Sequence, residues 1–157
     1  MMNLWQQFAL SHANTQASQG ISLHFEKGID PEFRRLCIKF ASWLRQNYSF
    51  PIHANIYIKN CRTVRLMNGR FVYGSFRFFE TKPPYIRIPA QIDPQEYEEC
   101  EDIEIYYSIL GSLVHELTHY FQWVAGLDQS DAVSERQANH FRFRIIEQFC
   151  EDCSLPY

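Results

Sequence analysis

Residues 113–123, LVHELTHYFQW, place two histidines four positions apart with a glutamate directly after the first. In a helix, His115 and His119 project from the same face about one turn apart, so each can offer a ring nitrogen to one zinc ion at about 2.0–2.1 Å. Glu116 lies too far round the helix to be a comfortable ligand, but it can take a proton from water held on the metal. The stretch therefore predicts a metal-binding helix with a carboxylate base beside the metal.

The surrounding residues predict one long, central helix over about residues 102–125. Its apolar residues recur every four positions, at Ile105, Ile109, Leu113, Leu117 and Phe121. Gly126 is well placed to end the helix in a left-handed conformation. The alternative is an ordinary amphipathic helix that happens to bury its histidines. Two adjacent buried histidines would need polar partners, which favours the metal site.

A catalytic zinc site has three protein ligands and one open position. One extended form of the motif has a third histidine six residues after the second, and Ala125 excludes it here. The downstream candidates for a third ligand are Asp128, Asp131, Glu135 and His140. Asp128 and Asp131 lie at the turn between the helices, where helix capping is the ordinary explanation for them.

Glu135 is the favoured third ligand. It lies one turn into a helix predicted over about residues 130–149, with Ser130 as N-cap, and this helix can fold back antiparallel onto the first. Asn139 follows four positions later on the same face, where its amide can hydrogen-bond a ligating imidazole. The alternative for Glu135 is a solvated helical glutamate.

The segments HELTH and SERQANHF together resemble the gluzincin metallopeptidases, in particular the compact ImmA/IrrE-type branch. The resemblance is close over about residues 105–147 and extends to the preceding sheet only in outline. It implies a zincin-like fold, zinc ligands His115, His119 and Glu135, and Glu116 as general base and acid. It also implies that Ala138 allows close helix packing. The YFQW that follows the motif departs from the small or aliphatic residues more usual there.

The rest of the chain predicts an α+β domain. Asp30 and Pro31 are typical of a helix start, and this helix should end near Tyr48, before Pro51. Alternating residues then predict strands over 52–59 and 84–90, and between them a hairpin at Asn68-Gly69 that joins 61–67 to 70–80. We expect an antiparallel or mixed sheet of three to four strands, whose neighbours meet through short turns. Residues 1–20 are predicted to be an N-terminal extension with a linker at 11–20, and residues 21–157 a single domain.

Gluzincin-like sites bind an extended peptide along an exposed sheet edge. The strand predicted over 70–79 is the candidate edge, with Arg70 and Arg77 beside the substrate and Gly74 allowing close backbone approach. Solvent-facing charges that discourage aggregation are an equal alternative. The developing oxyanion also needs a donor, for which His140 is favoured over Arg142 and Tyr120.

Composition narrows the remaining possibilities. A net charge of −3 gives no case for nucleic acid, and no apolar run is long enough to cross a membrane. The start of the chain does not resemble a secretory signal. Five scattered cysteines, with one CxxC at Cys150 and Cys153, favour thiols in a reducing cytoplasm over a four-sulfur site. A tail thiol on the zinc is a minor alternative to a solvated terminus.

These observations predict a cytoplasmic zinc metallopeptidase that acts on a flexible or unfolded segment of a protein. The alternative is a non-catalytic, zinc-stabilised module that binds or senses a protein. Hydrolysis of a non-peptide amide is a third possibility, for which the sequence offers no positive sign.

Overall fold

A computed structural model describes residues 2–11, 18–91, 95 and 98–157 and confirms the α+β class. In chain order the elements are α1 (Leu4–Gln7), β1 (Ile21–Phe25), α2 (Pro31–Asn47), β2 (Ala54–Lys59), β3 (Val64–Arg65), β4 (Phe71–Val72), β5 (Ser75–Arg77), β6 (Tyr85–Pro89), α3 (Asp102–Val124) and α4 (Asp131–Asp152). Most of the predicted linker at 11–20 lies outside the described residues. In the described part of the chain, no helix combines the length and apolar character of a membrane span.

The main sheet has the strand order β1-β2-β6-β5. β1 and β6 both run parallel to β2, and only β5 is antiparallel to its neighbour β6. The sheet is therefore a mixed sheet of four strands, within the range expected, but the expectation that neighbouring strands meet through short turns was wrong for the two parallel pairs. Parallel neighbours need a long crossover, and α2 supplies it between β1 and β2. β1 was not predicted, although Ile21, Leu23 and Phe25 alternate along it.

The hairpin predicted at Asn68-Gly69 is confirmed. β3 pairs antiparallel with β4, and Gly69 has a φ of 87°, which glycine adopts without strain. The strand predicted over 70–79, however, is two short strands in different sheets. β4 belongs to the hairpin, while β5 forms the edge of the main sheet, and Gly74 lies between them.

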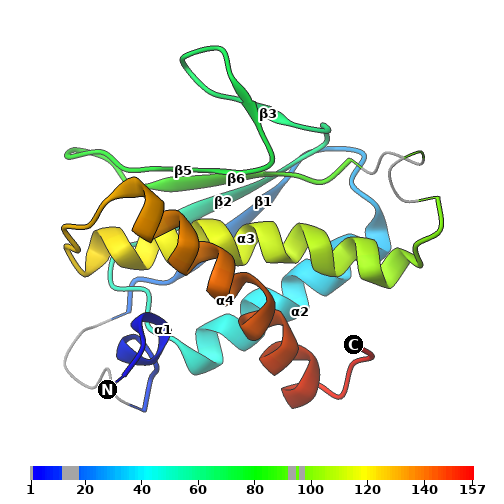
Figure 1. Cartoon of the computed structure of the whole chain (residues 1–157). Helices are drawn as coiled ribbons and strands as arrows, with labels where there is room; N and C mark the ends of the chain where they lie inside the picture. Colours follow the sequence, from blue (N-terminus) through cyan, green and yellow to red (C-terminus); the bar gives the residue numbers. More distant parts are fainter. Residues whose placement is uncertain (1, 12–17, 92–94, 96–97) are drawn as a thin grey trace.

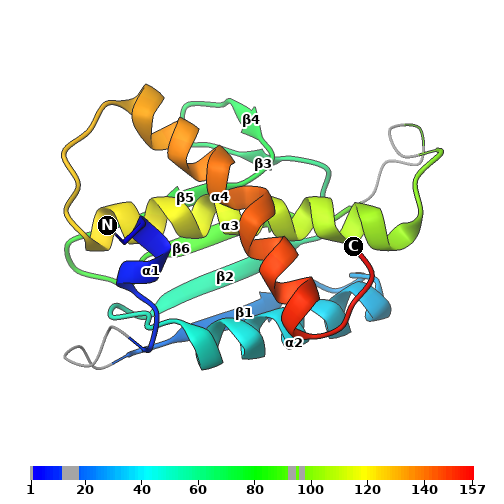
Figure 2. The ribbon, with the colours of Figure 1, turned by 60° about the horizontal axis from the view of Figure 1, so that its bottom comes forward.

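The helices lie on one side of the main sheet, and the β3–β4 hairpin projects from the other (Figure 1). α3 runs across the sheet with α4 packed on its outer side, while α2 lies beside α3 next to β1 (Figure 2). The predicted caps are confirmed: Asp30 accepts hydrogen bonds from the backbone of Glu32 and Phe33, and Ser130 caps α4. Gly126 has a φ of 66° after the end of α3, as expected. α4 runs three residues further than predicted, to Asp152.

The N-terminal residues reach the core and hold α3 in place. Leu4, Trp5 and Phe8 are buried, although the predicted division assigned them to the extension. The indole of Trp5 donates a hydrogen bond to Thr118 Oγ1 over 3.0 Å, and its ring packs edge-on against Phe121. Thr118 directly precedes His119, so these contacts fix the buried side of α3 and direct its opposite side outward.

Candidate metal centre

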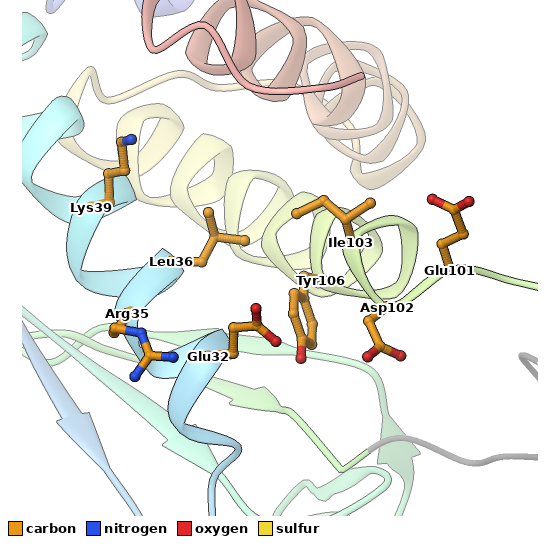
Figure 3. A pocket seen from close by; sticks show the side chains of 8 residues that line it. All are labelled: Glu32, Arg35, Leu36, Lys39, Glu101, Asp102, Ile103 and Tyr106. Carbon is orange, nitrogen blue, oxygen red and sulfur yellow. The ribbon is translucent and has the colours of Figure 1, made fainter.

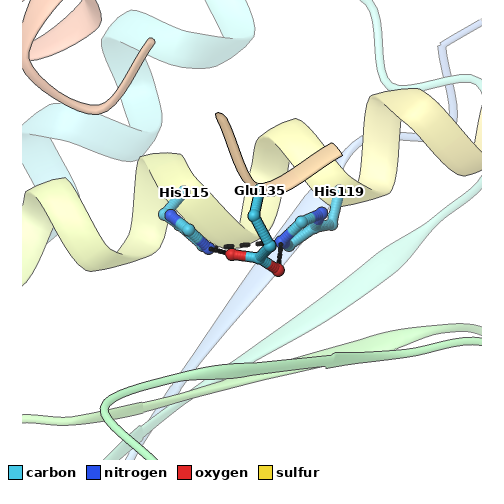
Figure 4. A group of neighbouring side chains, drawn as sticks. All are labelled: His115, His119 and Glu135. Atoms are coloured by element: carbon cyan, nitrogen blue, oxygen red, sulfur yellow. Dashed lines mark hydrogen bonds and ion pairs between the residues drawn. The ribbon is translucent and has the colours of Figure 1, made fainter. Parts of the chain in front are cut away.

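The three predicted ligands come together at the crossing of α3 and α4 (Figure 4). The two histidine Nε2 atoms lie 3.2 Å apart. Glu135 places Oε2 at 3.0 Å from His115 Nε2 and Oε1 at 3.0 Å from His119 Nε2. Its side chain is 56% exposed, whereas those of the histidines are 15% and 19% exposed. The two histidines thus lie on the buried side of the group, and Glu135 lies on its solvent side.

These separations fit a shared zinc ion. Ligand atoms at about 2.0–2.1 Å from a tetrahedral metal lie roughly 3.3 Å from one another. The three atom pairs measured above lie within a few tenths of an ångström of that spacing. The same pairs can also be joined by hydrogen bonds, so the protonation of the rings matters.

Gln122 sets the tautomer of the neutral His119 ring. The amide nitrogen of Gln122 donates to the carbonyl of Ser134 and to Gln137 Oε1, so its oxygen must be the atom that faces His119. That oxygen accepts a hydrogen bond from His119 Nδ1 over 2.8 Å. In the neutral ring, Nε2 then carries a lone pair that faces the Glu135 carboxylate. Two acceptors at 3.0 Å need a proton or a metal cation between them, and the donor set is one that zinc prefers.

Gln122 was not among the site residues predicted from the sequence. The signal was available, because position 122 is three residues after His119 and shares its helix face. Such a partner fixes the ring and its tautomer in many metal sites. Gln122 is the glutamine of YFQW, so its structural role explains part of the difference from the residues that usually follow the motif.

His115 has a different surrounding. Burial lowers the pKa of His115, and neighbouring His119 lowers it further, whereas Glu135 opposes them. Nδ1 of His115 is buried and has no hydrogen-bond partner. Asn139 lies close enough to favour the charged ring, although it does not complete a hydrogen bond to Nδ1. If Nε2 ligates a metal, Nδ1 carries the proton, and the amide oxygen of neighbouring Asn139 can accept a hydrogen bond from it.

Glu116 lies beside the ligands, and its side chain is largely buried. It is 8% exposed, and burial raises the pKa of its carboxyl to about 8, with Glu135 adding to the shift and Arg142 opposing it. A Cβ at Gly74 would lie 3.1 Å from Glu116 Oε1. The close backbone approach expected at Gly74 is therefore an approach to Glu116.

Two cavities open on either side of Glu116. The first, of about 360 Å³, is lined by Arg70, Val72, Tyr73, Gly74, Ser112, His115, Glu116, Glu135 and Arg142. The second, of about 510 Å³, is lined by Leu66, Val72, Gly74, Ser75, Phe76, Phe78, Glu116, His119, Gln122, Trp123, Leu127, Asp131, Ser134 and Glu135. The two share Val72, Gly74, Glu116 and Glu135, so together they form one groove between the strand segment and the two helices.

Of four other residues considered for the site, three lie outside the groove and one, Asp131, lines it. His140 is exposed, packs edge-on against Phe141 and lines neither cavity. Tyr120 turns away from the groove and bonds the backbone of Ile52 through its hydroxyl. Asp128 is exposed and outside both cavities, whereas Asp131 lines the second without joining the ligand group.

Arg142 lines the first cavity together with Arg70 and is held in place by hydrogen bonds to α3. Its guanidinium donates to the Ser108 carbonyl over 3.2 Å and to Ser112 Oγ over 3.1 Å. These contacts fix it along α3, about one turn before His115. The oxyanion donor favoured from the sequence, His140, faces solvent on the same helix because it lies two positions from Arg142 and points in another direction.

The cysteines are separate from this centre. All five are free thiols, and burial raises the pKa of Cys37 to about 12. Near Cys150 the tail folds onto α3, where the Tyr107 hydroxyl donates to the carbonyl of Pro156. The tail thiols do not belong to the ligand group.

A further cavity of about 640 Å³ lies between α2 and the start of α3 (Figure 3). Its basic side chains, Arg35 and Lys39, come from α2, and acidic side chains line it from both α2 and the start of α3, among them Glu32 and Asp102. Its last lining residue on α3, Tyr106, is roughly 13 Å along the helix from His115 at 1.5 Å per residue. It is too far away to be part of the metal centre.

Comparison with protein families, with curated proteins and with solved structures found no match. The resemblance of the two helical segments to gluzincins stays a prediction. Function is therefore inferred from the chemistry of the site.

Proposed function

We propose that the protein is a zinc-dependent metallopeptidase. The observation that carries this proposal is the buried Glu116 carboxylate, which lies beside a three-ligand group and between two connected cavities. A structural zinc site is normally closed by four protein ligands, whereas three ligands beside an open groove are typical of a catalytic one. The described residues supply three.

His115, His119 and Glu135 hold the metal, and Gln122 keeps the His119 ring in the ligating tautomer. Zinc bound there supplies a Lewis acid that lowers the pKa of water to about 7 and polarises a peptide carbonyl. The positive charge of the metal would favour the ionised form of Glu116, which could then take a proton from the attacking water and pass it to the departing amine. Glu116 is largely buried, and the absence of a side chain at Gly74 leaves room for its carboxyl group.

The substrate is a flexible peptide segment that lies extended along β5. β5 forms the edge of the main sheet and, among the residues that the structure describes, pairs with β6 alone, so its outer side can accept main-chain pairing. The free thiols favour a reducing compartment, and we place the protein in the cytoplasm.

The test is hydrolysis of unfolded proteins by zinc-loaded wild type and by Glu116→Gln, with cleavage sites identified by mass spectrometry. Removal of a general base lowers the rate by about 10²–10⁴-fold, while zinc content should stay unchanged. Glu147→Gln changes an exposed glutamate of α4 and is the matched control. A zinc-loaded wild type that cleaves none of these proteins, yet gains stability from zinc, would instead be a non-catalytic module.

A further inference from the structure

The two cavities of the groove differ in chemistry. We call the one beside His115 the arginine cavity, because Arg70 and Arg142 line it, and the one beside His119 the aromatic cavity, because Phe76, Phe78 and Trp123 line it. An extended chain that crosses the metal centre enters both. The two ends of the groove should therefore select different side chains.

The aromatic cavity has a preformed wall. Phe78 stacks on Trp123 with ring centroids 5.4 Å apart and planes inclined by 20°, and Phe76 packs on the same indole at 5.9 Å. Phe78 remains 58% exposed, although Trp123 is half-buried. Leu66 and Leu127 complete the apolar lining. An exposed aromatic wall of this kind is suited to a large apolar side chain, which would cover it.

The arginine cavity has the opposite character. Arg142 is fixed by Ser108 and Ser112, and Arg70 reaches the cavity from the exposed end of the β3–β4 hairpin. The acidic members of the lining are Glu116 and Glu135, both assigned to the metal centre. With a divalent cation in place, the arginine cavity carries a net positive charge. A carboxylate is the group that complements it.

We propose that the groove selects extended peptides with a carboxylate on the arginine side of the metal centre and a large apolar side chain on the aromatic side. The inference rests on the proposed function for the position of the scissile bond. The carboxylate can belong to an acidic side chain or to the C-terminus of the peptide. Arg70 and Phe78 are the specificity-determining residues, because both are exposed and neither holds the metal or its base.

Binding tests this specificity without cleavage. Zinc-loaded Glu116→Gln protein is titrated with fluorescently labelled peptides of about ten residues that carry one Phe and, two to four residues away, Glu, Gln or Lys. Each is made with a free and with an amidated C-terminus, which separates the two sources of the carboxylate. We expect the Glu peptides to bind about tenfold more tightly than the Lys peptides, and replacement of Phe by Ser to weaken binding by about fivefold.

Variants in the Glu116→Gln background locate the effect. Arg70→Gln should reduce the preference for Glu over Lys to about twofold or less, and Phe78→Ala should remove most of the preference for Phe over Ser. Arg144→Gln and Tyr157→Ala are matched controls, because these residues line neither cavity, Arg144 is exposed on α4 and Tyr157 is 65% exposed in the C-terminal tail. Both controls should bind like the parent.

Three results would overturn the proposal: no peptide binding, equal binding of the Glu and Lys peptides, or an Arg70→Gln variant that keeps the preference. Failure of the metallopeptidase proposal looks different. In that case, the peptides bind with the expected preference while zinc-loaded wild type leaves them intact. A wild type that cleaves Glu and Lys peptides at equal rates keeps the activity and refutes the specificity.

Discussion

The groove lies between two walls that are built in different ways: a helical wall formed by α3 and α4, and a strand wall formed by residues 66–78. On the helical wall, Glu116 and Gln122 are buried, and hydrogen bonds from Gln122 to Ser134 and from His119 to Gln122 link its polar side chains. The strand wall consists of elements of two or three residues, and Phe71, Tyr73 and Phe78 stand more than half exposed on it. The proposed chemistry belongs to the fixed wall, because ligands and base need set positions. The proposed selection of substrate belongs to the open wall.

The largest expected effect is on the helical wall. Glu135→Ala removes one of three ligands and should weaken zinc binding by more than about 100-fold, since partners outside the ligand set alone are worth about 10–100-fold. Bound zinc is measured after dialysis against a competing chelator, with Glu147→Ala as control. If Glu135→Ala binds zinc like wild type, the third ligand is wrong, and Asp131 should be tested next because it lines the adjoining cavity.

Gln122→Leu tests whether the helical wall depends on its hydrogen bonds. It removes the acceptor of His119 Nδ1 and should weaken zinc binding by about 10–100-fold without removing a ligand. Gln129→Leu is the control, because Gln129 also bonds Ser134 and Gln137 but does not contact either histidine. Equal zinc affinity in Gln122→Leu and wild type would show that the ring needs no such partner.

Gly74→Ala tests the contact between the two walls. The new Cβ would lie 3.1 Å from Glu116 Oε1 and 3.3 Å from Ile88 Cδ1, so the carboxylate must shift. We expect kcat/KM to fall by about tenfold while zinc affinity is retained, since small misplacements of a catalytic group are costly. Loss of zinc together with activity would mean that the strand wall supports the ligands as well.

The smallest expected effect is on stability. Burial raises the pKa of Glu116 to about 8, so folding favours its neutral form, and the metal-free protein loses stability as pH rises from the ordinary carboxyl range towards 8. Gln has no charge to bury. Metal-free Glu116→Gln should therefore melt roughly 3 °C higher than wild type at pH 8, with little difference at pH 4.5. A difference independent of pH would mean that the carboxyl is not held neutral by burial.

Prediction from the sequence succeeded where the relevant geometry is local. The spacing of His115 and His119 places both on one helix face whatever the rest of the chain does, because the helix repeats every 3.6 residues. The caps at Asp30 and Ser130, the turn at Gly69 and the helix end at Gly126 depend in the same way on neighbouring residues. The sequence by itself thus determined the α+β class and the elements that carry the candidate ligands.

The tertiary structure decided what depends on residues far apart in the chain. β1 and β6 are parallel to β2 because crossovers bring them together, and strand direction is not encoded in alternation alone. His140 and Arg142 are two positions apart on α4, but the angle at which α4 crosses α3 brings only Arg142 into the groove. The approach of Glu135 to His115 and His119 depends on the same crossing, since an angle between helices is set by how their surfaces pack.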